Sequence, residues 1–483
     1  MIPPSKQHTF LTWFGILFAL MLIPLEALAS DITKTINLTG HPVGYAAIVI
    51  FVLAYVLVMA EEFTHLRKSK PVILAAGIIW GMIGWIYVDR GFTHAAETAF
   101  RLNLLEFAEL FLFLLVAMTY VSSMNERRIF SALRSWLIRK GFGYRKLFWM
   151  TGILAFFLSP VIDNLTTALV MGAVVLAVGK NNKRFIGLAC IGIVVAANAG
   201  GAFSPFGDIT TLMVWQKGFV DFSAFFLLFI PSVVNYLVPA AIMHFFVPNE
   251  RPKADEEVIV MRRGAKVIIG MFVATIATAV SFHNFLQLPP MLGMMTGLAY
   301  LKFFGYYLKK THRPTVRDKE YYGTVGDIMP VARDEEQPFD IFSRLARAEW
   351  DTLLFFYGIV LSVGGLGFIG YLELASVTMY TDLGPTYSNI IVGLLSAIVD
   401  NIPVMFAVLT MNPEMPLGQW LLVTLTAGVG GSLLSIGSAA GVALMGQARG
   451  QYTFFSHLIW TPAIALGYAA SIAVHLWVNS AYF

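Results

Sequence analysis

Long apolar segments separated by short polar loops dominate the chain. They occur at about 43–60, 72–88, 104–123, 222–247, 265–283, 289–308, 349–371 and 452–477. Each approaches the roughly 20 residues that a helix needs to cross a bilayer. The pattern therefore predicts an all-α polytopic membrane protein.

The polar stretches divide this pattern into parts. The apolar residues 10–28 follow a short positive start and lead into ALAS at 27–30, so residues 1–30 are either a cleaved signal peptide or an extra span. The remaining chain is expected to form a first half at 31–247, a charged linker at 248–264, and a second half at 265–483 with a cytoplasmic loop at 309–347.

One polar core occurs twice, each time inside an apolar stretch. Ser159 precedes the pair Asp163-Asn164 by four residues, and Ser396 precedes Asp400-Asn401 in the same way. A carboxylate inside a membrane span is costly unless it is paired, hydrated or neutralised, so such residues are functional candidates by default. The repetition makes chance a poor explanation.

A glycine-rich stretch also recurs, as NAGGAFSPFGD from Asn198 and GVGGSLLSIGS from Gly428. We expect a broken helix at each copy. Two interpretations of the glycines stay open, namely backbone freedom and close helix packing. The predicted backbone breaks are Gly200, Gly201, Pro205, Gly430 and Gly431.

Composition agrees with the membrane interpretation, since 57% of residues are hydrophobic, 13% are charged and the mean hydropathy is +0.71. The net charge of +4 comes from bases in short loops, which is the positive-inside signal and no nucleic-acid-binding face. The expected partner is membrane lipid, in the plasma (inner) membrane, with the basic loops cytoplasmic.

The loop charges also predict a topology. If each Asp-Asn stretch is a re-entrant hairpin, all basic loops lie on one side, and the two hairpins enter from opposite faces. The chain would then consist of two inverted-topology repeats, each with a re-entrant hairpin and a discontinuous helix. This arrangement is typical of secondary transporters with a midplane site.

The polar residues at membrane depth are oxygen donors. Carboxylate, amide and hydroxyl oxygens suit hard cations, whereas imidazole and thiolate suit softer metals. Helix-to-helix hydrogen bonding remains the alternative for each single hydroxyl. We expect Na⁺ at an Asp163/Asp208 cluster and an Asp400 cluster, and no resident cofactor. The candidate residues are Asp163, Asn164, Thr166, Asn198, Asp208, Thr210, Thr211, Asp400, Asn401, Ser435 and Ser438.

Four further residues are candidates for supporting the site or for a proton path. They are Glu109, Asp351, Ser159 and Ser396. Glu106 and Glu349 lie near predicted span ends, where a solvated carboxylate is the competing interpretation.

The repeated S-x-x-x-D-N pattern together with NAGGAFSPFGDITT resembles the NhaD-type sodium/proton antiporters. These belong to an ion transporter superfamily that also includes dicarboxylate, citrate and arsenite carriers. The resemblance covers essentially the whole chain after residue 40. It implies an inverted-repeat fold, often dimeric, that exchanges sodium or lithium for protons, with the motif positions among the candidates above as its site. In the anion-carrying relatives neutral residues stand where this chain has Asp163 and Asp400.

Two other functions stay open. A sodium-coupled carboxylate or metalloid carrier could use the same scaffold. Two carboxylates and no buried Arg or Lys to offset them argue against an anionic cargo. An intramembrane aspartyl protease could pair Asp163 with Asp208 or Asp400. The stretch SPFGD lacks the first glycine of the G-x-G-D pattern, so we expect a transporter and no enzyme.

Overall fold

The computed structural model describes residues 35–64, 66–92, 94–179, 182–251, 259–311 and 349–483. All regular structure in these ranges is helical, which confirms the predicted class. The first half contains α3 (Pro42–Met59), α4 (Glu61–Thr64), α5 (Ser69–Asp89), α6 (Ala95–Glu126), α7 (Ile129–Arg139), α8 (Tyr144–Ile162), α9 (Asn164–Gly179), α10 (Lys183–Gly201), α11 (Ile209–Gln216), η1 (Phe222–Leu228) and α12 (Phe229–His244).

The second half begins with a hairpin of two long helices and ends in shorter, broken ones. Its elements are α13 (Ala265–Leu286), α14 (Pro290–Lys310), α17 (Trp350–Phe368), α18 (Tyr371–Ser376), the π-helical turn η3 (Val377–Asp382), α19 (Pro385–Ser396), α20 (Asn401–Met411), α21 (Leu417–Gly430), α22 (Ala439–Gln447), α23 (Phe454–Leu458), α24 (Thr461–Val478) and η4 (Ser480–Tyr482). The predictions for 1–30, for 312–347 and for the centre of the linker lie outside the described residues.

Nine helical segments of the described chain are long and apolar enough to cross a membrane, which confirms the multi-span prediction. They are α3, α5, α6, α8, α10, η1 with α12, α13, α17 and α24. The largest difference from the sequence pattern is α7, which forms where the bases predicted a loop at 127–146. Its apolar side chains lie along one side of the helix and pack against α6 and α9, so the bases of this stretch do not mark a loop.

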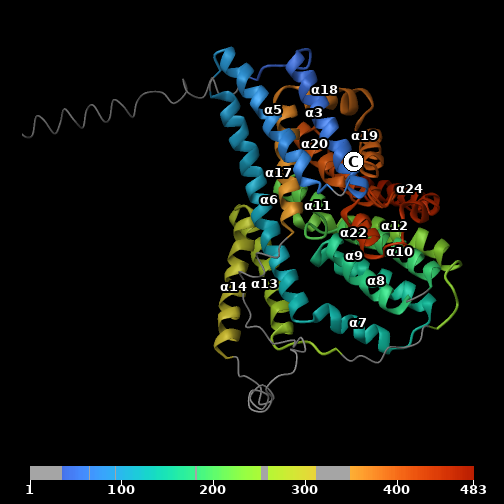
Figure 1. Cartoon of the computed structure of the whole chain (residues 1–483). Coiled ribbons are helices and arrows are strands. Elements are labelled where there is room, and N and C mark those ends of the chain that lie inside the picture. Colours follow the sequence, from blue (N-terminus) through green and yellow to red (C-terminus); the bar gives the residue numbers. More distant parts are fainter. Residues whose placement is uncertain (1–34, 65, 93, 180–181, 252–258, 312–348) are drawn as a thin grey trace, which may run out of the picture.

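The two broken-helix regions lie at different heights of the molecule. In Figure 1, α8 and α9 lie in the lower part of the view, α19 and α20 in the upper part, and α11 and α22 between them. Helices α8, α9 and α10 pack together, as do α19 and α21. The regions meet where α9 contacts α22 and α10 contacts α21, while α13 and α14 pack beside α6.

Equivalent contacts recur in the two regions. Ser159 Oγ donates to the carbonyl of Ala197 at 2.6 Å, and Ser396 Oγ donates to that of Ala427 at 3.0 Å. The glycine contacts match as well, because a Cβ at Gly200 would lie 2.2 Å from a carbonyl oxygen of α8. A Cβ at Gly430 would lie 2.1 Å from one of α19. None of the four paired glycines has a positive φ, so close packing explains them and backbone freedom does not.

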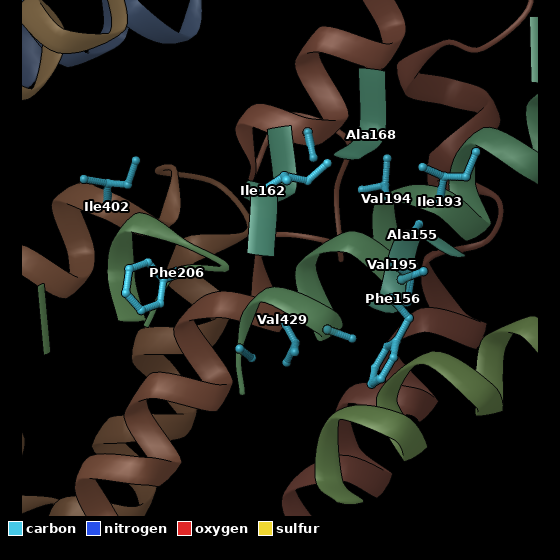
Figure 2. Close-up of a cluster of buried hydrophobic side chains, with 14 of the residues drawn as sticks. Ala155, Phe156, Ile162, Ala168, Ile193, Val194, Val195, Phe206, Ile402 and Val429 are labelled. Carbon is cyan, nitrogen blue, oxygen red and sulfur yellow. The ribbon is translucent and has the colours of Figure 1, made fainter. Parts of the chain in front are cut away.

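Apolar side chains from both halves pack around the broken helix ends. Figure 2 shows Ile162 and Phe206 from the first half in one cluster with Ile402 and Val429 from the second. All four are buried. Close packing of this kind holds helices together inside a membrane, where lipid is as apolar as the side chains. It fixes the positions of the polar residues at the breaks.

Candidate functional site

Two aspartates occupy the points where helices break. Asp163 separates α8 from α9 with φ 69°, and Asp400 separates α19 from α20 with φ 49°. Such positive values are uncommon for residues other than glycine and mark strained positions that cluster at functional sites. Asp163 folds back onto α9, where its Oδ1 accepts from Thr166 N at 2.8 Å and its Oδ2 from Thr166 Oγ1 at 2.9 Å.

The carboxylate of Asp208 connects the two broken-helix regions. It caps α11, with Oδ1 accepting from Thr210 N at 3.1 Å. Its Oδ2 accepts from Asn164 Nδ2 at 2.8 Å and from Asn401 Nδ2 at 2.9 Å. The two asparagines of the repeated pattern therefore bind one oxygen atom, although 237 positions separate them in the chain.

A second asparagine network extends this cluster. Asn198 Oδ1 accepts from Asn164 Nδ2 at 3.1 Å, and Asn198 Nδ2 donates to Ser438 Oγ at 3.0 Å. Thr211 lies close by, but its hydroxyl donates to the backbone carbonyls of Ser204 and Asp208. Thr211 therefore stabilises the turn before α11, and its hydroxyl is less free to bind a ligand than the sequence suggested.

Four helices begin at this cluster, namely α9, α11, α20 and α22. Their first residues or N-caps are the aspartates, asparagines and serine described above. Helix N-termini carry partial positive charge and unpaired N–H groups, which favour nearby anions. The helix ends thus help to hold ionised carboxylates where bulk water is scarce.

Several buried oxygen atoms at the cluster have no hydrogen-bond partner among the described residues. They are Asp400 Oδ1, Thr167 Oγ1, Thr210 Oγ1 and Ser435 Oγ. Unpaired buried polar atoms are rare in proteins and point to an unobserved water or ion. Ser159 and Ser396, by contrast, are engaged with backbone carbonyls, so they support the helices next to the site.

A cavity of about 570 Å³ leads to the cluster. Asp163, Asp208 and Asn401 line it, as does Pro205, and apolar side chains of α6, α9 and α11 form much of its wall. Arg134 of α7 lines it as well. A small cation could therefore reach the carboxylates through this space.

Lys68 and Glu349, like Arg134, are charged residues in the cavity lining that were not predicted as parts of the site. Lys68, directly before α5, is a half-buried residue of this lining, so it adds a positive charge there without contradicting the expectation that no buried Arg or Lys offsets the carboxylates. Glu349, expected to be a solvated span end, lines the same cavity. The sequence gave no sign that Lys68 and Glu349 belong to the site, because both lie far from the repeated motifs along the chain. The packing of α5 against α17 brings the two residues to the cavity.

Two predicted supporting residues lie away from the cluster. Asp351 accepts a hydrogen bond from Ser69 Oγ between α17 and α5. Glu109 lines a separate cavity of about 200 Å³, together with an ion pair between Glu106 and Lys217. This second cavity lies at the ends of α11 and α20 that point away from the cluster.

Comparisons with known proteins agree with this geometry. Residues 42–428 match the model of a family described as citrate transporters. The chain is 60% identical to the Na(+)/H(+) antiporter NhaD of Alkalimonas amylolytica, over 97% of each protein. It is 59% identical to that of Halomonas elongata, over 96% of this chain and 94% of the relative. It is also 30% identical to the sodium/proton antiporter 1 of Arabidopsis thaliana, over 95% of this chain and 77% of the relative. The chain therefore belongs to the citrate transporter family of membrane proteins and, within it, to the NhaD-type antiporters.

Proposed function

We propose that this protein exchanges Na⁺ for H⁺ across a membrane. Relatives that match almost the whole chain at 59–60% identity are named as antiporters of these two ions. The observation that carries the proposal is the position of Asp208, whose carboxylate faces a cavity and joins asparagines from both broken-helix regions.

The cation is proposed to bind among carboxylate, amide and hydroxyl oxygens. Asp163 and Asp208 form one part of this site, and Asp400 with its unpaired Oδ1 forms the other. Sodium is a hard cation that prefers oxygen ligands. The buried hydroxyl of Ser435 is available as a further ligand, because it has no partner among the described residues. The buried hydroxyl of Thr210 is available in the same way, while Asn164, Thr166, Asn198 and Ser438 hold the site together.

Exchange follows if both cations use the same carboxylates. A proton neutralises the oxygens that sodium needs, and bound sodium disfavours protonation, so the two ions compete. A site that opens alternately to each side then carries one ion in each direction. The cavity provides access from one side in this conformation.

We further propose that the halves are inverted repeats and that the basic loops lie in the cytoplasm, with the protein in the plasma (inner) membrane. The matching serine and glycine contacts support a repeat. The separate heights of the two broken-helix regions in Figure 1 support entry from opposite faces. Lithium transport, a homodimeric assembly and the lack of a resident cofactor stay predictions.

A carboxylate carrier is the second candidate, because the matching family model is described as citrate transporters and the cavity is large enough for a small organic acid. Lys68 and Arg134 line that cavity. The carboxylates of Asp163, Asp208 and Glu349 in the same lining would repel an anion, however, and Coulomb repulsion is strong where water is scarce. We therefore favour cation exchange.

Proteoliposomes with an imposed proton gradient and an enclosed pH dye separate these functions. We expect sodium to evoke proton flux without any organic acid present. Asp163→Asn and Asp400→Asn should each abolish this flux while the protein remains folded, because each removes a negative charge at nearly constant volume. Sodium-evoked flux that requires citrate would support the carrier instead, and normal flux in both variants would refute the proposed site.

A further inference from the structure

Lys68 places a positive charge in the lining of the cavity that contains Asp163 and Asp208. Its ammonium lies over the ring of Phe355, 4.5 Å from the centroid. Among the described residues no carboxylate forms an ion pair with it. An ammonium that lines a cation cavity, lies over an aromatic ring and forms no ion pair in the described part of the chain is an unusual feature in a membrane protein.

The alternative is that Lys68 has no role at the site and, as a residue at the end of a span, extends toward interfacial water, as lysines commonly do. Its surroundings restrict it more than that. The next residue, Ser69, is buried and donates through Oγ to Asp351 on α17. Phe355 lies one turn further along α17 and is fully buried. The packing of α5 against α17 therefore fixes the backbone at Lys68 and the ring that its ammonium contacts.

The ammonium is also close enough to influence the site electrostatically. The charge of Lys68 acts on Asp400, and the charge of Glu349, in the same cavity lining, acts on Asp163. The carboxylates of the site thus lie in a field to which Lys68 and Glu349 contribute with opposite signs, and Arg134 lines the same cavity. A transporter needs such balance, since a cation held too tightly leaves the site too slowly.

We propose that Lys68 sets the affinity of the cation site, with its fixed ammonium repelling the cation bound at Asp208 and Asp400 and so allowing its release into the cavity. This inference rests on the proposed cation transport. Lys68 contributes no ligand, because an ammonium carries no lone pair for a cation. Lys68 acts on the bound cation only through its charge, so removing that charge should strengthen sodium binding.

The magnitude follows from Coulomb's law. The repulsion between two unit charges in a partly hydrated cavity is screened by an effective dielectric constant of about 20. Removing the lysine charge should therefore strengthen sodium binding on the order of tenfold.

The test compares three variants in vesicles held at the same pH on both sides, above the pKa of the site, because below it Lys68 would repel the competing proton as well as sodium. Lys68→Met keeps the length of the side chain and its contact with Phe355 but removes the charge, and should lower the half-saturating sodium concentration about tenfold without raising the maximal velocity. Lys68→Arg keeps the charge and should stay within about twofold of the parent. Lys70→Met removes an exposed charge from the same helical turn and should have no effect.

A half-saturating concentration that is unchanged or higher in Lys68→Met would overturn the inference and leave the lysine as a span-end anchor. Sodium-dependent thermal stabilisation of the purified protein measures the affinity without transport. If the parent protein exchanges no ions but sodium still stabilises it, tighter binding in Lys68→Met supports this inference while the proposed exchange fails. If exchange is normal and the affinity does not move, this inference alone is wrong.

Discussion

Asn164 and Asn401 offer the most direct way to perturb the site without touching a carboxylate. Both amides donate to Asp208 Oδ2, at 2.8 and 2.9 Å. Asn401→Ala removes the donor from the second half, and Asn164→Ala removes the one from the first. Hydrogen bonds to the ionised form of a carboxylate favour that form over the protonated one. Each variant should therefore shift the competition at Asp208 toward the proton.

The expected size follows from the strength of a hydrogen bond to a charged group, about 1.5–3 kcal/mol. At 1.4 kcal/mol for each factor of ten, the half-saturating sodium concentration should rise about 10- to 100-fold where protons compete. This rise in the half-saturating sodium concentration should be smaller at higher pH, because protons no longer compete with sodium for Asp208. The assay is sodium-evoked proton flux in vesicles, measured at several sodium concentrations and at two pH values.

Asn389 provides a matched control. It is another fully buried asparagine, on α19, and its amide donates to the backbone and side-chain oxygens of Gln419 at 3.0 Å. Asn389→Ala should lower the melting temperature and leave the half-saturating sodium concentration unchanged. If both Asn164→Ala and Asn401→Ala are folded and stay within twofold of the parent at the lower pH, Asp208 is no part of the sodium site.

Two further predictions concern access from each side, and both use variants freed of the single cysteine. The first concerns the ion pair between Glu106 and Lys217, which we expect to close the second cavity. Glu106→Gln should then make Leu409→Cys react severalfold faster with a thiol reagent added outside, and exchanging the two charged residues should restore the slow rate. Equal labelling rates in all three proteins would show that the ion pair does not close the cavity. The second concerns the broken-helix regions, which we expect to enter the membrane from opposite faces. Lys183→Cys should then react with a reagent on the cytoplasmic side and Glu414→Cys with one outside. Reaction of both cysteines from the same side would exclude an inverted repeat.

The repeated pattern predicted the centre of the site from the sequence because its polar residues are local to each broken helix. Asp163 and Asp400 could be identified as unusual from their apolar neighbours alone. That Asn164 and Asn401 share one oxygen of Asp208 could not be predicted, since it depends on how two distant regions pack.

Charged residues at span ends were the hardest to interpret, because a sequence does not say whether such a side chain turns outward or inward. Lys68 and Glu349 turn toward the cavity, whereas Asp351, expected nearer the site, pairs with Ser69. The basic residues of 127–146 predicted a loop, because α7 is only 11 residues long and its short apolar side is hard to recognise among the surrounding charges.

The central claim is that sodium and protons compete for the same carboxylates, and the half-saturating sodium concentration measured against pH tests it most directly. Vesicles are held at matched pH on both sides, and proton flux is recorded over a range of sodium concentrations. The account predicts that the apparent affinity weakens about tenfold for each unit fall in pH below the pKa of the site, levels off above it, and leaves the maximal velocity much less changed. An affinity that does not vary with pH, with only the velocity changing, would contradict the shared site even if the protein exchanges the two ions.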